Sequence, residues 1–398
     1  MISFPEASAI LRDHVQLLKT ESCKLLQADG RTLREPILAD RDFPPFDRVM
    51  MDGFALRTGD WLAGIQRYKI SHVAPAGASK TQLSLEPGTC VAVMTGAPCP
   101  EGADLIIPIE EALDLTDTQV AFSEQFRIES GRYIHRMGSD ARAGDPLLES
   151  GCRIGSREIG IAASCGAALV IVSSRPSIGV FSTGDELVGI EEIPLPHQIR
   201  QSNGISIGAA LTRCGYPARR IGHLTDDSVA AKSAIADALA VDDFLILTGA
   251  VSMGQRDFIP DLMAELGCTQ LFHGVKQRPG KPVGAWRGPR GQIILGLPGN
   301  PVSALTGLHA LAIPMLGQAS GITEIPVMQV RFRDGARQLP DFTHHLPVKM
   351  DPDGFAEPAA TGNSGDFIGL LRSDGFVTIP PGGTSALELS AVAFTRWL

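Results

Sequence analysis

The stretch "QIILGLPGNPVSALTGLHALAIPML" (292–316) joins an apolar, β-branched segment to a segment that is apolar at helical spacing. The first part predicts a buried strand and the last part a helix. Between them, Gly299 allows close backbone approach, Asn300 can cap the helix, and Pro301 gives up no needed N–H group. The turn therefore predicts a rigid helix start rich in N–H donors, which suits an anion. Any tight turn into a helix favours the same residues, so the turn alone does not decide between structure and ligand binding.

The same order of strand and helix repeats from about residue 175 to residue 320. Apolar strand patterns alternate with segments of helical periodicity, and Asn203 and Asp227 stand at two expected helix starts. Such alternation predicts a parallel sheet wrapped by helices. The expected strands are "SIGVFSTG" (177–184), "ARRIGHL" (218–224), "DFLILTGA" (243–250) and "QIILGL" (292–297), and the expected helices are "GISIGAALTRC" (204–214), "DSVAAKSAIADALA" (227–240), "DFIPDLMAELG" (257–267) and "PVSALTGLHALAIPML" (301–316).

The regions on either side of this alternation read differently. Ser3 and Glu6 form a possible capping box before a first helix. From Pro36 to about Ser150, short apolar stretches broken by Gly, Pro, Asp and Thr indicate a small β module inserted after that helix. Short apolar stretches broken by turn residues return from about residue 323 and predict a C-terminal β domain.

Composition places the chain among ordinary soluble proteins of several domains. It has 398 residues, 20% of them charged, and a net charge of -9, which gives no general attraction to nucleic acid or anionic membranes. The aliphatic runs are far shorter than the roughly 20 residues of a membrane helix, and residues 1–18 lack a secretory signal pattern. We therefore predict a cytoplasmic protein with no nucleic-acid or membrane partner, whose seven cysteines are buried reduced thiols.

Turns of unusual composition follow three of the expected strands: "STGDEL" (182–187), "TGAVSMGQRDF" (248–258) and "LPGNPVSA" (297–304). Ligands of open α/β sheets collect outside the carboxyl ends of the strands. Three such turns at one edge favour a ligand site over a purely structural explanation. "RPGKP" (278–282) adds Arg278 and Lys281, which could converge on an oxyanion or a phosphate. A lone basic pair would more often be a solvated loop.

Carboxylates in loops or at element ends complete this set. Acids beside a phosphate-binding edge suggest Mg²⁺, which uses one or two carboxylates together with ligand phosphate oxygens. The alternative is helix capping, and Asp227 favours it, whereas Asp52 in "MDGFA" is not near an obvious helix start. The acids are Asp52, Asp140, Asp185, Glu186, Asp226, Asp227 and Asp257.

Two further motifs, "FPPFDRVMMDGFA" (43–55) and "MTGAPCPEGAD" (94–104), precede these turns in the chain. Together with the turns and "RPGKP", they resemble in order and spacing the molybdopterin molybdenumtransferases, the family of bacterial MoeA and the C-terminal domain of gephyrin. The resemblance implies an α/β plus β fold in an elongated, L-shaped homodimer. Its parts would be a split linker domain (1–42 and 143–172), an inserted β domain (43–142), an α/β molybdopterin-binding domain (173–322) and a C-terminal β barrel (323–398).

The resemblance also implies a reaction. Adenylylated molybdopterin and molybdate enter, the pyrophosphate bond is cleaved with Mg²⁺, AMP leaves, and the dithiolene captures molybdenum. The inserted domain of one subunit would reach the α/β domain of the other. A molybdopterin adenylyltransferase and recipient molybdoenzymes are possible further partners.

Site residues follow from the resemblance and from the turns that carry it. Asp52, Asp140, Glu186, Asp227 and Asp257 would be catalytic acids, with Thr95 beside them, and Asp52, Glu186 and Asp257 would be the metal ligands. A tetrahedral dianion needs fixed cations and N–H or O–H donors, which Arg278, Lys281 and Ser364 would supply. The expected ligand-binding residues are Ser182, Thr183, Gly184, Gly249, Ser252, Arg278, Lys281, Pro298, Gly299, Asn300, Pro301 and Ser364.

The chain departs from the family pattern at several positions. Arg48 and Val49 stand where Asn and Ser are usual, "GSD" (138–140) replaces Gly-Glu-Asp, and "TGA" (248–250) replaces Ser-Gly-Gly. Arg278 occupies a position where the family often has Lys, and His344 occupies one where it has Arg. These changes leave an alternative open, a carrier that holds molybdopterin or the finished cofactor for one apoenzyme. Retention of Asp52, Glu186 and Asp257 favours the enzyme. A nucleotidyltransferase that makes the adenylylated intermediate would leave the inserted module unexplained.

Overall fold

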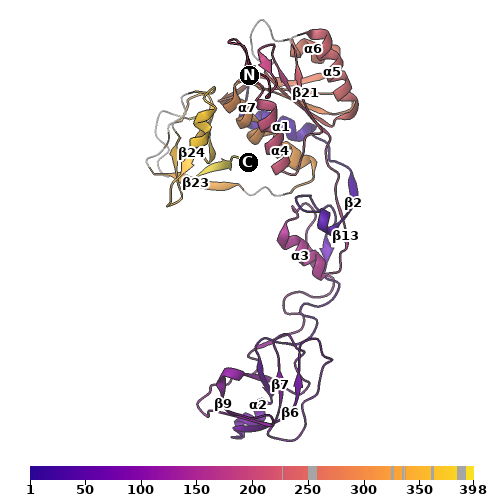
Figure 1. The fold of residues 1–398 in the computed structure, drawn as a ribbon, viewed down its shortest axis with the longest axis vertical. Coiled ribbons are helices and arrows are strands. Elements are labelled where there is room, and N and C mark those ends of the chain that lie inside the picture. Colours follow the sequence, from indigo (N-terminus) through magenta and orange to yellow (C-terminus); the bar gives the residue numbers. More distant parts are fainter. Residues whose placement is uncertain are drawn as a thin grey trace. The chain divides into compact units, whose positions relative to one another are not determined.

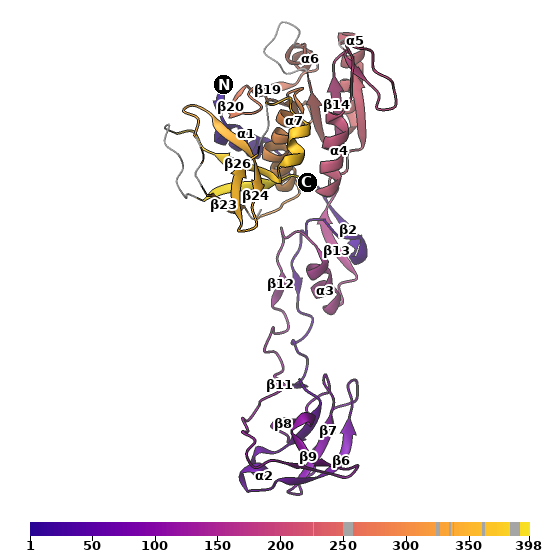
Figure 2. The same ribbon diagram turned by 60° about the vertical axis from the view of Figure 1, so that its left-hand side comes forward.

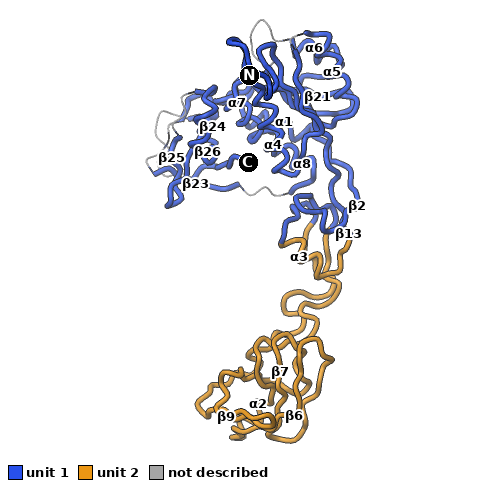
Figure 3. Tube along the Cα trace, viewed as in Figure 1, with its two compact units in different colours: residues 1–35, 150–156, 169–398 blue, residues 36–149, 157–168 orange. Residues whose placement is uncertain are grey.

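The computed structural model describes residues 1–225, 227–249, 258–323, 327–333, 336, 338–359, 363–382 and 391–398. The chain forms two compact units (Figure 3). Unit 1 contains residues 1–35, 150–156 and 169–398, and unit 2 contains residues 36–149 and 157–168. The expected division into four domains stays a prediction.

A six-stranded sheet with the order β17-β14-β18-β22-β21-β19 forms the centre of the α/β part of unit 1 (Figure 1). The first four strands run parallel, whereas β21 runs antiparallel to both β22 and β19. The four strands expected from the sequence therefore form a parallel sheet, as predicted, and β21 and β19, which the sequence analysis did not expect, add an antiparallel edge to it. The strands are β14 (Ile178–Thr183), β17 (Arg220–Leu224), β18 (Phe244–Thr248), β19 (Thr269–His273), β21 (Gly284–Arg287) and β22 (Ile293–Leu297).

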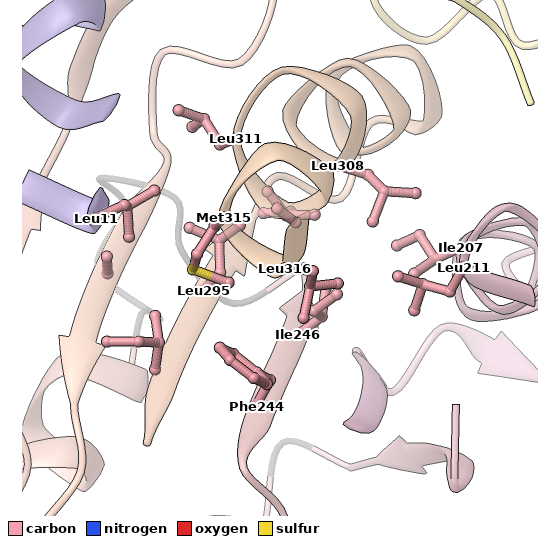
Figure 4. Packing of buried hydrophobic residues seen from close by; sticks show 14 of the residues in the cluster. Leu11, Ile207, Leu211, Phe244, Ile246, Leu295, Leu308, Leu311, Met315 and Leu316 are labelled. Carbon is pink, nitrogen blue, oxygen red and sulfur yellow. The ribbon is translucent and has the colours of Figure 1, made fainter. Parts of the chain in front are cut away.

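Helices cover both faces of this sheet, and its strands are therefore buried on both sides. One core cluster joins one face to α1, α4 and the helix that follows β22 (Figure 4). A second cluster joins the opposite face to α5 and α6. The helices are α1 (Phe4–His14), α4 (Asn203–Arg213), α5 (Ser228–Val241), α6 (Ile259–Glu265), α7 (Pro301–Gly307), a π-helical turn (Leu308–Ala312) and α8 (Ile313–Ala319).

The segment from Pro301 to Ala319 is one continuous helix of 19 residues, long and apolar enough by composition to cross a membrane. Leu308, Leu311, Met315 and Leu316 on it belong to the core cluster that joins the sheet, α1 and α4 (Figure 4). Its apolar character is therefore that of a core helix. Within the described residues, no other helix has this length and composition.

A small barrel follows the α/β part. Strand β24 pairs with β25 on one side and with β26 on the other, so the order β24-β25-β23-β27-β26 closes on itself. Both views show this barrel next to α7 (Figure 2). Its strands are β23 (Met328–Phe332), β24 (Thr343–Met350), β25 (Phe355–Pro358), β26 (Gly375–Ile379) and β27 (Val392–Arg396), and a 3-10 turn covers Ile368–Arg372.

Two strands from earlier in the chain extend the barrel sheet. β1 (Ile2–Ser3) pairs in parallel with β20 (Val275–Arg278), and β20 pairs in parallel with β24. β20 is followed directly by the "RPGKP" loop and then by β21 of the α/β sheet. This loop therefore connects the two large sheets of unit 1. The remaining strands of the unit are β2 (Thr20–Lys24) with β13 (Leu169–Ser173), and β15 (Leu187–Val188) with β16 (Ile199–Arg200), and a 3-10 turn covers Leu25–Gln27.

Unit 2 is the β module that the broken apolar stretches predict. Its sheet has the order β8-β5-β7-β6-β10-β9, and core clusters lie on both of its faces. The elements are β3 (Ile37–Leu38), β4 (Arg48–Val49), β5 (Gly53–Leu56), α2 (Thr58–Leu62), β6 (Arg67–Ala74), β7 (Thr89–Val93), β8 (Leu105–Pro108), a 3-10 turn (Ile109–Glu111), β9 (Ala112–Leu115), β10 (Gln119–Phe122), β11 (Ile134–His135), β12 (Pro146–Leu148) and α3 (Ser156–Ser164).

One local expectation is confirmed, one holds in part and one is wrong. Ser3 and Glu6 form the capping box of α1. Five of the seven free thiols are buried, whereas Cys152 and Cys165 are partly exposed. Burial raises the pKa of Cys90 to about 12 and that of Cys268 to about 11, which keeps them protonated. Asn203 does not cap α4: the helix begins at Asn203, and Ser202 occupies the cap position without a side-chain hydrogen bond.

Candidate functional site

The three turns of unusual composition meet at one edge of the α/β sheet. β14, β18 and β22 are adjacent and parallel, so their carboxyl ends point the same way. A pocket of about 530 Å³ lies at this edge and takes residues from all three turns, including Thr183, Thr248 and Pro298. Sequence reasoning expected this convergence, and the topology produces it. Residues 250–257 of the middle turn lie outside the described part of the chain, so the expected ligand contact at Ser252 has no structural description.

Buried hydroxyls tie the first turn to the second. The Thr183 hydroxyl donates to the Thr248 carbonyl oxygen at 3.1 Å, and the Thr248 hydroxyl donates to the Ser182 hydroxyl at 3.3 Å. All three side chains are at most 4% exposed. Buried hydroxyls need such partners because an unpaired one costs free energy. These bonds hold the ends of β14 and β18 in register at the pocket.

Glycine is required where the turns approach each other. Gly184 and Gly249 have φ values of 135° and 111°, which side chains rarely adopt. A Cβ on Gly249 would lie 2.6 Å from the carbonyl oxygen of Thr183. A Cβ on Gly299 would meet the Gly249 Cα at 3.4 Å, so the second and third turns also lie in contact. Gly249 and Gly299 thus bring backbone groups, and not side chains, to the wall of the pocket, whereas Gly184 is not one of its lining residues.

Asn300 stands at the cap position of α7, but it makes no side-chain cap hydrogen bond. Its amide Nδ2 donates instead to the hydroxyl of Ser364 at 2.9 Å. The expectation that Asn300 caps the helix with its side chain is wrong: its Oδ1 accepts no backbone N–H of α7, and the amide is instead oriented by its bond to Ser364. Asn203 Nδ2 similarly donates to the carbonyl oxygen of Gly299 at 2.8 Å. Both asparagines thus fix the third turn.

A second pocket, of about 560 Å³, lies beside the first. Arg278, Lys281, Ser364 and His344 line it, and Arg278 is opposite His344 in the β20–β24 ladder. Arg278 and Lys281 are both exposed. Three residues line both pockets, namely Pro282, Pro298 and Asn300.

The acids of unit 1 divide into different roles. Glu186 lines the first pocket. Asp227 caps α5 by accepting from the backbone N–H of Val229 at 2.9 Å, so the structure supports the capping explanation for it. Asp226 and Asp257 lie outside the described residues. The described part of the chain holds no cluster of three or more His, Cys, Asp or Glu side chains that could bind a metal ion. A carboxylate at the lining of such a pocket still fits Mg²⁺, which takes most of its ligands from water and substrate phosphates.

Asp52 and Thr95 form a compact pair in unit 2. They lie in the loops before β5 and after β7, which are neighbouring strands. Asp52 Oδ1 accepts from the Thr95 backbone N–H at 2.6 Å and from its hydroxyl at 2.7 Å. These two bonds, the backbone one first, lower the pKa of Asp52 below its usual value. The result is an exposed carboxylate that stays ionised and holds one orientation.

Asp140 lies in the same unit and is held by two side chains. His135 Nε2 lies 2.8 Å from Asp140 Oδ1, and the Ser139 hydroxyl donates to the same oxygen at 3.3 Å. Arg48 contacts the other ring nitrogen of His135 at 3.0 Å. Val49, the second departure from the family pattern here, is 1% exposed in the core of unit 2. Its apolar side chain is therefore explained by packing.

Sequence reasoning missed several pocket residues. Arg200 and Gln201 line the first pocket, and Gln201 Nε2 donates to the Ser182 hydroxyl at 3.3 Å and to the Gly222 carbonyl oxygen at 3.1 Å. His223 Nε2 donates to the Gly184 carbonyl oxygen at 2.7 Å and supports the first turn. Only the polarity of "IRQSN" (199–203) directly before a helix could have drawn attention to this segment.

Family models match both halves of the chain. One described as the MoeA N-terminal region (domain I and II) covers residues 2–166, and one described as a probable molybdopterin binding domain covers residues 179–318. The chain is 36% identical over 402 residues to the molybdopterin molybdenumtransferase of Synechocystis sp., with all of both chains covered. It is 31% identical over 387 residues to that of Bacillus subtilis, covering 93% of this chain and 88% of the relative. The crystal structure of a molybdopterin biosynthesis moeA protein from Pyrococcus horikosii matches with a TM-score of 0.76 and 27% identity, over 100% of this chain and 99% of that one.

Proposed function

The chain belongs to the molybdopterin molybdenumtransferase family and is a transferase of molybdenum cofactor biosynthesis. From this premise we propose a role for each group of site residues. The reaction we propose inserts molybdenum from molybdate into adenylylated molybdopterin and releases AMP. The observation that supports this most strongly is the pair of pockets with a shared wall of Pro282, Pro298 and Asn300. One pocket suits a phosphorylated pterin, and the other suits a small oxyanion.

The first pocket would take the phosphate-bearing substrate. Gly249 and Gly299 line it, and Arg200 supplies a cation. Strand ends and helix starts of this kind bind phosphates through N–H groups and the helix dipole. The buried bonds among Ser182, Thr183 and Thr248 would keep the site organised before substrate binds.

The second pocket would take molybdate. A tetrahedral dianion is stabilised by fixed cations and by hydroxyl or N–H donors, and Arg278, Lys281 and Ser364 provide these groups at its lining. His344 stands where the family usually has Arg, and Arg278 retains charge with a planar, bidentate geometry. The oxyanion would lie across the shared wall from the reacting end of the pterin.

Magnesium would be held by Glu186 and Asp257 in the α/β part and by Asp52, with substrate phosphate oxygens completing the coordination. When bound, Mg²⁺ offsets the charge that develops on the leaving phosphate. Glu186 at the pocket lining and the fixed, ionised carboxylate of Asp52 are both suited to this role. Thr95 would orient Asp52, whereas Asp227 would act through its cap on α5.

We propose a homodimer in which Asp52, Thr95 and Asp140 of one subunit complete the pocket of the other. We also propose a cytoplasmic enzyme that receives its substrate from a molybdopterin adenylyltransferase and passes its product to molybdoenzymes. The test is AMP release from adenylylated molybdopterin with molybdate and Mg²⁺. AMP release that requires molybdate supports the enzyme, whereas tight pterin binding without AMP release would identify a carrier.

A further inference from the structure

Unit 2 contains a line of three hydrogen-bonded side chains that includes Arg48, one of the departures from the family pattern. Arg48 Nη2 lies 3.0 Å from His135 Nδ1, and His135 Nε2 lies 2.8 Å from Asp140 Oδ1. Arg48 and His135 are directly opposite each other in the antiparallel pair β4–β11. Their ladder neighbours Val49 and Ile134 are buried, so the two polar side chains share the outward face. Arg48 is the residue that replaces the usual Asn.

The chemistry of the three groups determines where the ring proton lies. A guanidinium only donates hydrogen bonds, so Nδ1 of His135 must accept from Arg48. The ring is then neutral with its proton on Nε2, and Nε2–H donates to the carboxylate of Asp140. A proton on Nδ1 would place two N–H groups against each other and would leave Asp140 without this donor. Arg48 therefore selects the ring form that can hold Asp140.

The surrounding backbone keeps this line in place. Asp47 accepts from Arg136 Nη1 at 2.6 Å and from the Met137 backbone N–H at 2.9 Å, which ties the loop after β11 to the residue before β4. The Asp140 N–H donates to the Phe43 carbonyl oxygen at 2.9 Å. The imidazole is one quarter exposed and the Asp140 side chain is 57% exposed. The carboxylate is therefore oriented and still accessible to a ligand.

We infer that Arg48 and His135 are positioning residues: Arg48 fixes the Nε2–H form of His135, and His135 orients the carboxylate of Asp140 for the transfer reaction. The catalytic importance of Asp140 rests on the proposed function, whereas the ring form of His135 does not. The departure from Asn at position 48 thus belongs to a different way of holding the same acid. Ser139, which replaces a Glu in the family pattern, adds a second donor to the same oxygen.

The first test reads the ring form directly and is independent of activity. Protein labelled with ¹⁵N at histidine is studied by NMR at pH 7.5, and His135→Gln assigns the signals. We expect one Nδ1 signal in the unprotonated range and one Nε2 signal in the protonated range. In Arg48→Asn, which restores the usual family residue, the two signals should move toward each other as both tautomers become populated. A wild-type signal with a protonated Nδ1, or signals that Arg48→Asn leaves unchanged, would overturn the inference.

The second test measures AMP release. Losing a hydrogen bond to a charged group corresponds to a change on the order of tenfold, so His135→Ala should lower kcat by about that factor with little change in KM for the pterin substrate. Arg48→Lys should retain more activity than Arg48→Ala, because a lysine also donates. His72→Ala, on β6 of the same unit, is the control and should match the wild type. An equal loss in His72→Ala, or full activity in His135→Ala with an active wild type, would contradict the positioning role. An inactive wild type with the expected NMR signals would refute the proposed function alone.

Discussion

The side-chain amide of Asn300 donates to the hydroxyl of Ser364 at 2.9 Å, and the backbone N–H of Val302 donates to the carbonyl oxygen of the same serine at 3.3 Å. Ser364 is therefore joined to the start of α7 by both its side chain and its backbone. Asn300 lines both pockets, and Ser364 lines the second. This contact forms part of the wall across which pterin and oxyanion would meet.

Breaking the Asn300–Ser364 contact should weaken the response to molybdate. A neutral hydrogen bond contributes ~1 kcal/mol, so Asn300→Ala should raise the molybdate concentration for half-maximal AMP release by a few fold. Ser364→Ala and the double variant complete a thermodynamic cycle, and we expect a coupling of about 1 kcal/mol because the residues are in contact. The control pair is Asn203→Ala with Ser364→Ala, since Asn203 bonds to Gly299 instead. Coupling as large in the control pair would argue against a specific contact.

Removing Asp52 should separate binding from turnover. Its carboxylate is exposed and fixed by Thr95, and we assign it to metal binding or positioning and not to pterin affinity. Asp52→Ala should nearly abolish AMP release while pterin binding, measured by titration calorimetry, stays close to that of the wild type. Equal losses of binding and turnover would refute this assignment.

Thr95 should determine how far AMP release persists as the pH falls. Its backbone and side-chain hydrogen bonds lower the pKa of Asp52, so the ionised form persists to a lower pH than it would in an ordinary Asp. Thr95→Val removes the hydroxyl donor and should raise the pKa of Asp52 toward its usual value. The acidic limb of AMP release should then move to higher pH, and ¹³C NMR of the Asp52 carboxyl should show the same direction. The control is Thr118→Val, at an exposed threonine of unit 2. It should not change the pH at which AMP release falls in acid.

A side chain at position 249 should disturb the pocket. The φ value of 111° and the 2.6 Å approach of a Cβ to the Thr183 carbonyl oxygen both oppose it. We expect Gly249→Ala to lower stability by roughly 1–3 kcal/mol and to reduce AMP release, as measured by thermal unfolding and by turnover. Gly160→Ala in α3 has no atom within 4 Å of the new Cβ and should be neutral or slightly stabilising. Similar losses at both positions would contradict the steric explanation.

The buried carboxylate of Asp242 should make the α/β part sensitive to acid. Burial alone would raise its pKa, but hydrogen bonds from Arg219 and Ser177 and the charges of Arg219 and Arg220 outweigh burial and lower it. A lowered pKa in the folded state gives stability above the usual aspartate value, and this stability is lost as the pH falls through the folded-state pKa. Asp242→Asn should cost roughly 3 kcal/mol near neutral pH, and the difference from the wild type should shrink in acid.

Urea unfolding between pH 3 and pH 7 measures this effect. The exposed Asp237 on α5 offers the matched control, because Asp237→Asn changes the same charge without a buried partner. A gap between Asp242→Asn and the wild type that stayed constant across this range would show that the ionised carboxylate is not the stabilising species.

The sequence predicts the site best where local pattern and topology agree. The strands ending at Thr183, Thr248 and Leu297 are short buried runs, and parallel strands place their carboxyl ends at one edge. Convergence of the three turns therefore follows from pattern alone. The capping box at Ser3 and the cap at Asp227 are likewise local and were predictable.

Long-range pairing accounts for most of what the sequence does not predict. The β20 segment "VKQR" (275–278) has little apolar pattern, and its pairing with β24 brings Arg278 opposite His344. The Arg48–His135 contact joins residues 87 positions apart. Asn300 was expected to bond locally to its own helix, but its partner lies in the barrel part of the chain. In each case a distant partner decides the role of a polar side chain.

The most direct test of the account supplies the purified protein with adenylylated molybdopterin and Mg²⁺ and measures AMP with and without molybdate. We predict AMP release that rises with molybdate and falls in Lys281→Ala, because that cation lines the pocket that we propose for the oxyanion. Pterin binding without AMP release, under conditions in which the Bacillus subtilis relative works, would contradict the central claim.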